Sequence, residues 1–337
     1  MGWQSIIAQK KRCSLCKQRM ICWGYTTAKS VRWRCTRCHR GQCWKRADVT
    51  RRNRNNLKNR WMLGVASLTS IARRMCVHRT TLSRRFSALD VLPSRVPLRP
   101  LTHPPVLVLD GTVISKTTVL VIAYDTISDQ PLAWSFVSRE RFDVWHTLLV
   151  HISAHYQPHA IVSDGQKGLR KAIKALFPHI PHQRCLAHII RLSLAWLTRN
   201  PQTLAGQELR MLVRNLAQVK TPFFANTWSH SFMTWNARYE SFLKEKSINP
   251  ATGRKWYTHR KLRAVRSLIA HALPNLFFFT TDRYIPNTTN AVEGGINAIL
   301  AELLHRHRGI TEQQKKTLVT RFLYARRRRK LPTRNAT

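Results

Sequence analysis

The chain has 337 residues, and its 58 Lys and Arg against 15 Asp and Glu give a formal net charge of +43. Solubility needs far less charge than this, so we expect a polyanionic partner, with nucleic acid first. A protein of acidic membrane surfaces or of ribosomes is the alternative class, but 11 Trp, 12 Phe and an apolar fraction of 43% supply a sizeable core. The length predicts two or three domains.

No segment indicates export or membrane insertion. The first residues, MGWQSIIAQKKRC, lack the long apolar stretch and the cleavage site of a signal peptide. The longest apolar run, Val119–Tyr124, is far shorter than the roughly 18 residues of a membrane span. We therefore expect a cytoplasmic protein with no membrane partner.

Cysteines crowd the amino-terminal region, which in a reducing compartment indicates metal binding rather than disulfides. Four of them form two C-x2-C pairs: Cys13, Cys16, Cys35 and Cys38. Four thiolates from two tight turns match the tetrahedral set that Zn2+ prefers, so residues 1–48 are predicted to form a zinc ribbon with a structural Zn2+. Cys22 and Cys43 are interpreted as packing residues, with replacement of a ligand as the alternative. The ribbon either contacts DNA or is only a folding staple, and the sequence favours neither.

Residues 49–90 are predicted to hold two short helices joined by a tight turn at Met75–Val77. Apolar spacing from Leu68 to Phe86 resembles a helix-turn-helix DNA-binding domain, although Cys76 stands where glycine is common. A buried helical hairpin with a basic face is the alternative. The second helix would bring to a DNA groove the residues His78, Arg79, Thr80, Thr81, Ser83 and Arg84. Five prolines between Asp90 and Pro105 then predict a stiff linker over residues 91–105.

The order of elements after the linker predicts the fold class. Strands are expected at Val106–Leu109, Thr117–Tyr124 and Leu132–Val137, then a helix at Asp143–Tyr156, a strand at Ala160–Val162, a helix at Lys167–Phe177, a strand at Ile180–Arg184 and a helix from Cys185. Three antiparallel strands followed by alternating helices and strands is the order of a ribonuclease H-like fold. We predict a multi-domain chain with an α/β ribonuclease H-like catalytic core, whose first part is residues 106–199.

Three of the few acids are candidates for a metal site in this core. The first and fourth strands of such a fold lie side by side, which would bring together Asp110 and Asp164, each after an apolar strand. Adjacent carboxylates repel each other unless cations share the site, so they indicate two hard ions such as Mg2+ or Mn2+. Such a pair of ions supports phosphodiester chemistry. Glu293, on a helix over the sheet, would complete the set. A turn or helix-capping residue is the alternative for Asp110 alone.

The stretch from Asp164 to Glu293 is longer than this core needs. Helical spacing at Gly206–Val219 and Thr227–Lys246 predicts an all-helical insertion over residues 200–280, followed by the final core helices over residues 281–325 and a basic tail over residues 326–337. The tail is a solvated end, a nonspecific DNA clamp, or both. Arg254 and Lys255 are predicted to contact phosphates. Four aromatic residues are interpreted as core, with base stacking as the alternative: Trp228, Trp235, Tyr239 and Trp256.

Three short motifs resemble those of the Mutator-related transposases of bacterial insertion sequences: VSDGQKG around Asp164, CLAH from Cys185 to His188, and TNAVEGGIN with Asn290 and Glu293. The resemblance spans roughly residues 105–324. It implies that Asp110, Asp164 and Glu293 are a DDE metal-binding triad and that Cys185, His188 and Asn290 are signature residues. We interpret the Cys185 and His188 pair as structural, ahead of a metal site or a nucleophile. A second insertion-sequence family, with a zinc-binding amino terminus and an Asn-x-x-Glu-Gly motif, is the alternative.

The resemblance implies a DNA transposase that binds terminal inverted repeats and catalyses metal-dependent cleavage and strand transfer. Its partner would be double-stranded DNA, both transposon ends and target. A homodimer is expected because two ends must be brought together, and a bacterial, nucleoid-associated location follows. A noncatalytic DNA-binding protein, domesticated or decayed, is the alternative from another class, and a nuclease of the same fold without strand transfer is the third possibility.

Overall fold

The computed structural model describes residues 12–27, 30–43, 47–62, 66–87, 98, 100–307 and 309–328. The chain divides into two units, residues 1–91 and 92–337. Most of the expected linker before Leu98 and the tail beyond Arg328 lie outside the described residues. Within the described part of the chain, no helix combines the length and apolar character that crossing a membrane requires.

The first unit starts with a small antiparallel sheet in the order β1-β2-β3. Its strands are β1 (Met20–Tyr25), β2 (Val31–Cys35) and β3 (Gly41–Cys43). The helices that follow are α1 (Ala47–Met62), α2 (Leu68–Arg74) and α3 (Arg79–Ser87). Cys22 and Cys43 are both exposed, so the interpretation of these two residues as packing residues is wrong. The core of this small sheet is formed by Cys13, Met20 and Cys35, and it does not extend to either residue.

Helices α2 and α3 have the two-helix arrangement expected from the apolar spacing. Ser67 caps α2 by accepting a hydrogen bond from the Ser70 backbone N–H at 3.0 Å. Cys76, in the turn, adopts a left-handed φ of 51°, the conformation that glycine adopts at no steric cost. A small core holds the two helices together, formed by Ile71, Ala72, Leu82 and Phe86. The turn was therefore predicted at the correct place, including Cys76, which stands where glycine is common.

The second unit is built around a five-stranded sheet in the order β6-β5-β4-β7-β8. The strands are β4 (Val106–Ser115), β5 (Thr118–Asp125), β6 (Gln130–Val137), β7 (Ala160–Ser163) and β8 (His182–Arg184). The first three pair antiparallel, whereas β4 with β7 and β7 with β8 pair parallel. The expected neighbourhood of the first and fourth strands is thus present.

Strand β4 is longer than predicted, and Asp110 lies inside it rather than at its end. The pairing with β5 continues beyond Asp110 to Ser115 opposite Thr118, because the two strands join in a tight hairpin. The parallel pairing with β7 stops earlier, at Leu109 opposite Ser163. Asp110 is therefore an interior residue of one ladder and lies just past the end of the other.

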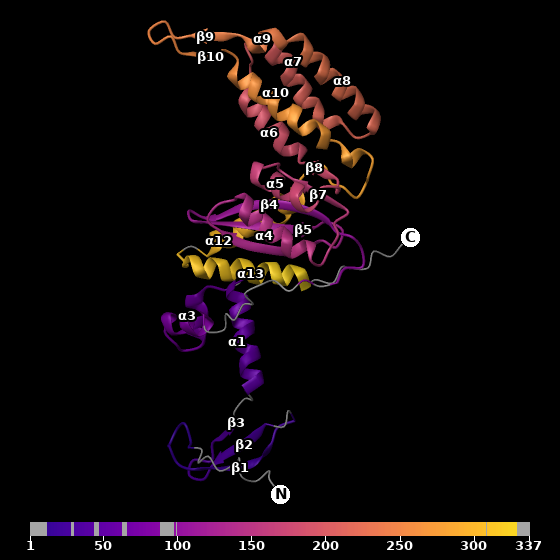
Figure 1. The fold of residues 1–337 in the computed structure, drawn as a ribbon. Coiled ribbons are helices and arrows are strands. Elements are labelled where there is room, and N and C mark those ends of the chain that lie inside the picture. Colours follow the sequence, from indigo (N-terminus) through magenta and orange to yellow (C-terminus); the bar gives the residue numbers. More distant parts are fainter. Residues whose placement is uncertain are drawn as a thin grey trace. The chain divides into compact units, whose positions relative to one another are not determined.

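Both faces of the sheet are covered, as the complete burial of Val106 to Leu109 requires. Helices α4 (Phe142–Ser153) and α5 (Lys167–Leu176) pack on one face around Leu107, Leu109 and Trp145. The long helix α13 (Glu312–Arg328), drawn in yellow in Figure 1, contacts the edge strand β6, where Tyr324 meets Trp134 edge-on at 5.0 Å between ring centroids.

The basic tail was expected to start at residue 326, but α13 continues to Arg328. Arg327 is buried, and Arg326 lies 3.8 Å from the Asp129 carboxylate. Arg326 and Arg327 are therefore part of the folded unit.

A separate helical layer continues from β8, as Figure 1 shows at the end of the second unit opposite α13. Its elements are α6 (Leu186–Leu197), α7 (Leu204–Asn215), a 3-10 turn at Leu216–Gln218, α8 (Pro222–Arg238), α9 (Glu240–Lys244), α10 (Arg260–Ala272) and 3-10 turns at Leu273–Asn275 and Phe278–Thr280. Trp228 and Trp235 are buried in its core and donate their indole N–H groups to the Leu212 and Ala205 carbonyls. The interpretation of these two residues as core is confirmed.

The prediction that this layer is all-helical is wrong at one place. Strands β9 (Lys246–Ile248) and β10 (Lys255–Tyr257) form a two-stranded antiparallel hairpin. Its loop is closed by Asn249, whose side-chain oxygen accepts from the Ala251 N–H at 2.9 Å, and by Gly253 with φ of 62°. These turn residues stop the helical pattern, and Trp256, 40% exposed on the hairpin, does not join the core.

Candidate active site

Asp110 and Asp164 meet at the edge of the sheet where β4 and β7 stop pairing. The last paired residues of the two strands are Leu109 and Ser163. Asp110 directly follows the first of them and Asp164 the second. Asp110 is only 7% exposed, and Asp164 is half-buried. Two carboxylates from strands far apart in sequence therefore face the same small region, as the fold order predicted.

Glu293 reaches this region from a distorted helix. The chain passes from α11 (Asn290–Val292) through one π-helical turn, Glu293–Asn297, into α12 (Ala298–Arg306). Such π turns often occur at functional sites. Positions four apart lie near one face of a helix, and Asn297 from the same turn donates its Nδ2 to Asp110 Oδ2 at 2.9 Å. The π turn thus brings an acid and an amide to Asp110.

The electrostatics of Asp110 show how close the acids are. Burial and then the negative charge of Glu293 raise the pKa of Asp110 to about 7, with a further rise from Asp164. The hydrogen bond from Asn297 acts in the opposite direction. A cation in this place would relieve both the desolvation and the repulsion.

Glu140 is a fourth acid at this edge, and the sequence interpretation missed it. A Cβ atom at position 111 would overlap the Glu140 carboxylate, so Gly111 leaves the space that this side chain fills. Burial, followed by the charge of Asp164, raises the pKa of Glu140. The sequence signal was the glycine directly after Asp110, because Glu140 itself stands between two arginines before a helix and attracts no notice.

The loop after β7 is fixed by its own short contacts. Gln166 donates its backbone N–H to Asp164 Oδ1 at 2.9 Å and its side-chain Nε2 to the Glu140 carbonyl at 3.0 Å. Gly165 has φ of 85°, and the Arg184 guanidinium occupies the place of its missing side chain while donating to the Asp164 carbonyl at 3.0 Å. A side chain at position 165 would therefore be both strained and blocked.

The signature pair Cys185 and His188 lies beside Glu293. In the described part of the chain, two groups of three or more potential ligands have atoms within 4.8 Å of one another, and one of them is Cys185, His188 and Glu293. Asp110 and Asp164 belong to neither group. Burial opposes ionisation of Cys185, but hydrogen bonds from His188 and Thr289 outweigh it and lower the pKa of the thiol, while the bond to Cys185 raises the pKa of His188. Asn290 is exposed, so the asparagine that contacts an acid is Asn297 instead.

The second group is the predicted zinc site. The sulfur atoms lie 3.6 Å apart for Cys13 and Cys38, 3.4 Å for Cys16 and Cys35, and 3.6 Å for Cys16 and Cys38. Four sulfurs around one Zn2+ at about 2.3 Å would be about 3.8 Å apart, so the cluster fits this ion. Backbone N–H groups of Cys38 and Arg37 lower the pKa of Cys35 to about 6, which favours the thiolate that binds metal.

Most of the residues predicted to contact DNA are exposed, as this role requires. On and before α3, His78, Arg79, Thr80 and Arg84 are exposed, whereas Thr81 and Ser83 are half-buried. In the second unit, Arg254 and Lys255 are exposed on the β9–β10 hairpin. Beside them, the Arg263 guanidinium stacks on the Tyr257 ring at 3.5 Å from its centroid.

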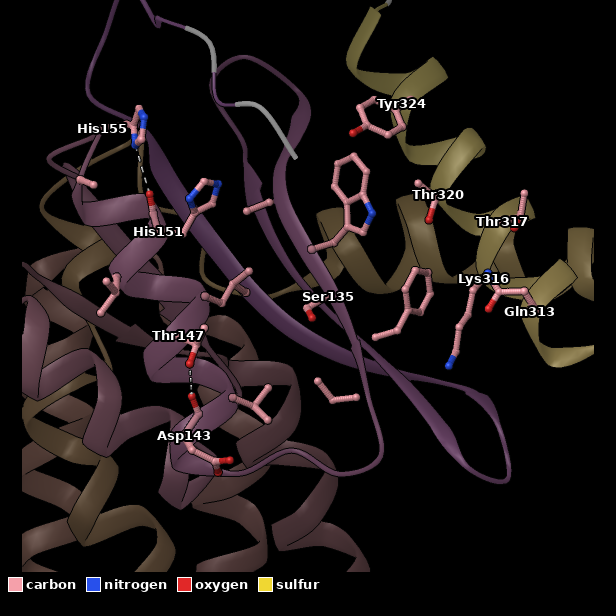
Figure 2. A pocket seen from close by; sticks show the side chains of 18 residues that line it. Ser135, Asp143, Thr147, His151, His155, Gln313, Lys316, Thr317, Thr320 and Tyr324 are labelled. Carbon is pink, nitrogen blue, oxygen red and sulfur yellow. Dashed lines mark hydrogen bonds between the residues drawn. The ribbon is translucent and has the colours of Figure 1, made fainter. Parts of the chain in front are cut away.

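A cavity of about 930 Å3 lies elsewhere, between α4, β6 and α13. Figure 2 shows His151, His155 and Thr147 on its α4 wall and Lys316, Thr320 and Tyr324 on its α13 wall. None of the three candidate carboxylates lines it, so this cavity is separate from the acidic edge.

A protein-family model matches part of the chain. Residues 108–244 match the model described as "Transposase, Mutator family". This segment resembles the transposases of the Mutator family. The Mutator-family match includes Asp110, Asp164, Cys185 and His188, and it stops before Glu293.

Two further comparisons add little to the Mutator assignment. No curated protein matches the chain. Among solved structures, the cryoEM structure of a simian T-cell lymphotropic virus intasome in complex with the PP2A regulatory subunit B56 gamma is similar at 16% identity, over 46% of this chain and 70% of that chain. Its TM-score is 0.21, and a likeness of that size carries no conclusion about this chain.

Proposed function

We propose that this chain is a DNA transposase of an insertion sequence, with Asp110, Asp164 and Glu293 as its catalytic carboxylates. One observation carries the proposal: acids from two adjacent parallel strands and a distant π turn act on one another in a chain that has few acids. The pKa of Asp110 is raised by burial and by the charges of Glu293 and Asp164 together. Keeping repelling acids in a basic protein has a direct explanation if cations share the site.

The donor set fits a hard divalent cation. Beside the carboxylates, the Asn297 Oδ1 is buried and has no hydrogen-bond partner among the described residues. Carboxylate and amide oxygens are the ligands that Mg2+ and Mn2+ take. Asp110, Asp164 and Glu293 would hold two such ions, which would activate the attacking oxygen and stabilise the leaving one.

Residues of the chain itself hold the carboxylates in place and favour their ionised form. Asn297 favours the ionised form of Asp110, and Gln166 fixes the Asp164 carboxylate through its backbone N–H. In the proposed reaction, water attacks the phosphodiester at the transposon end and the P–O3′ bond breaks, which leaves a 3′-hydroxyl. This hydroxyl then attacks a target phosphodiester, forms the new P–O bond and releases a target 3′-hydroxyl. No covalent enzyme intermediate is needed.

The fold supports the same proposal at a finer level. Three antiparallel strands, a parallel fourth strand beside the first and a parallel fifth are consistent with a ribonuclease H-like core. The α2–α3 pair would act as a helix-turn-helix that reads terminal inverted repeats, and the four-cysteine sheet would be a zinc ribbon. We further propose a homodimer that pairs two ends, acting at the bacterial nucleoid in the cytoplasm.

Cleavage of DNA that carries the element's ends tests the function. We expect the purified chain to cut at the ends with Mg2+ or Mn2+, and Asp164→Asn and Glu293→Gln to abolish cutting while still binding the ends. Glu302→Gln is the matched control, because Glu302 is an exposed residue of α12 whose carboxylate pairs with Arg306 on the same helix.

The products separate the rival functions. End-specific cutting by Asp164→Asn would disprove the assigned site. Specific binding without cutting by any form would establish the noncatalytic DNA-binding protein instead. Cut ends that never join target DNA would indicate a nuclease without strand transfer.

A further inference from the structure

The third carboxylate is held by side chains that lie outside the triad. Glu293 Oε1 accepts a hydrogen bond from the Thr289 hydroxyl and lies 3.4 Å from His188 Nδ1. Its other oxygen, Oε2, lies 3.5 Å from Arg191 Nη1. Arg191 is largely exposed, whereas Thr289 is fully buried. The contact from Thr289 is therefore the most deeply buried of the three.

Thr289 also contacts Cys185, so one side chain joins the thiol to the third carboxylate. The Thr289 Oγ1 lies 3.3 Å from Cys185 Sγ, and the Thr289 backbone N–H donates to the same sulfur at 3.3 Å. A threonine hydroxyl has one proton, and an ionised carboxylate can only accept. The Thr289 hydroxyl has both the Cys185 sulfur and Glu293 Oε1 within donor distance, so its one proton is shared between these two acceptors. Thr289 therefore links Cys185 to Glu293.

Cys185 is in turn fixed to the strand that carries Asp164. Its backbone N–H donates to the Ser163 carbonyl at 2.8 Å, one residue before Asp164. The next residue, Leu186, donates its N–H to the Asn287 carbonyl at 2.9 Å, just before Thr289. Cys185 thus joins the end of β7 to the segment that leads into the π turn. The side chain is completely buried, so these contacts are made without competition from water.

We propose that Cys185 and Thr289 are positioning residues, which hold the Glu293 carboxylate at the acidic edge through the Cys185–Thr289–Glu293 chain of hydrogen bonds. This inference rests on the proposed function, in which Glu293 is a metal ligand. Carboxylate ligands are usually oriented by outer hydrogen bonds, and loss of such a partner typically weakens metal affinity or activity by about 10–100-fold. The C-x2-H signature would then act on the metal site without binding the metal.

Paired substitutions at both positions test the chain of bonds. Thr289→Val keeps the shape and removes the hydroxyl, whereas Thr289→Ser keeps the hydroxyl. Cys185→Ala removes the hydrogen-bonding side chain, whereas Cys185→Ser keeps one. Thr288→Val is the matched control, since Thr288 is half-buried in the same segment and its hydroxyl accepts from the Asn290 N–H rather than contacting Glu293. Binding of Mn2+ alone is measured by the loss of the free-ion signal in electron paramagnetic resonance, together with the single-turnover rate of end cleavage.

We expect Thr289→Val to weaken Mn2+ binding and to slow cleavage by about 10-fold or more, and Cys185→Ala to act in the same direction. Thr289→Ser and Cys185→Ser should restore most of the loss, with DNA affinity and melting temperature unchanged. Wild-type Mn2+ binding in Thr289→Val, or no rescue by Thr289→Ser, would overturn the inference. Loss of a bound Zn2+ in Cys185→Ala would also overturn it, in favour of a Cys-His-Glu metal site. Failure of the proposed function is distinct, because Glu293→Gln would then cleave normally.

Discussion

Asn297 donates a hydrogen bond to Asp110 at 2.9 Å, although 187 positions separate the two residues in sequence. The bond links the π turn that carries Glu293 to the strand at the centre of the sheet. It also opposes the three influences that raise the pKa of Asp110, which are burial and the charges of Glu293 and Asp164. The geometry and the ionisation of the site therefore depend on the same contact.

Removing this contact should shift the pH dependence of metal binding. In Asn297→Ala the charged form of Asp110 loses a stabilising donor, so its pKa should rise above the value of about 7 that it has with the bond. A hydrogen bond to a charged group is worth about 1.5–3 kcal/mol, which corresponds to a shift of roughly one to two pH units. The midpoint of Mn2+ binding against pH should move upward by this amount. An unchanged midpoint would contradict the assignment; Asn215→Ala, on an exposed position of α7, is the control.

Neutralising Asp110 should stabilise the metal-free protein at high pH. The pKa of this group is raised on folding from 3.8 to about 7, so between these values the folded state binds the extra proton and stability falls as pH rises. The loss is on the order of 4 kcal/mol once the pH exceeds about 7. Asp110→Asn avoids it and should melt several degrees higher than the wild type at pH ~8 in Mg2+-free buffer. Added Mg2+ should then raise the melting temperature of the wild type alone.

A methyl group at position 111 should disturb the acidic edge directly. Gly111→Ala would place its Cβ on the Glu140 carboxylate, so that either the strand or Glu140 must move. We expect cleavage to fall by at least about 10-fold while DNA binding persists. Adding Glu140→Ala should relieve the overlap and recover the stability lost by Gly111→Ala in a double-mutant cycle. Gly294→Ala, where a Cβ meets open space, should cost no stability. If the stability changes caused by Gly111→Ala and Glu140→Ala were strictly additive, the overlap would be excluded.

One Zn2+ per chain should be present in the purified protein. The four sulfurs of the amino-terminal cluster are close enough to share one ion, so Cys35→Ser should lose it and weaken binding to the transposon ends. Elemental analysis gives the stoichiometry. Cys22→Ser, at an exposed cysteine outside the cluster, should keep the ion. A chain that purifies without zinc and binds DNA equally well would disprove the zinc site.

The β9–β10 hairpin should contribute phosphate contacts. Each Lys or Arg that neutralises a phosphate adds about 0.9 to the slope of log affinity against log salt, so Arg254→Ala with Lys255→Ala should lower that slope by up to about two. The effect should be similar for all DNA sequences. Arg238→Ala is the control, because Arg238 already pairs with Glu208 at 3.4 Å. Equal slopes for the double variant and the wild type would show that the hairpin does not contact DNA phosphates.

Sequence patterns predicted the sheet well, because the buried strands are almost wholly apolar. Val106–Leu109 and Ala160–Val162 could be recognised as adjacent strands from the order of elements, and this alone brought Asp110 near Asp164. The α2–α3 turn was equally accessible, since helix caps and apolar spacing are local. The hairpin at residues 246–257 was missed because its strands are short and exposed and so lack an apolar period.

The residues that complete the site were not accessible in the same way. Glu140, Thr289 and Asn297 act through neighbours that only the folded chain supplies, and each is an ordinary residue in its local sequence. Gly111 and Gly165 give a hint, because each admits a side chain from elsewhere into the space next to an aspartate. Such a glycine shows where a side chain from elsewhere approaches, but it does not show which side chain this is.

The distance along the chain between Asp110 and Asn297 also has a consequence for biosynthesis. At roughly 5–20 residues per second, a ribosome has finished the strands of the sheet many seconds before it reaches the π turn. Until Asn297 has emerged and the intervening helical layer has closed on itself, the nascent chain has its two aspartates without the third acid or the amide. The proposed DNA-cutting centre would therefore stay incomplete on the ribosome until residue 297 has been made.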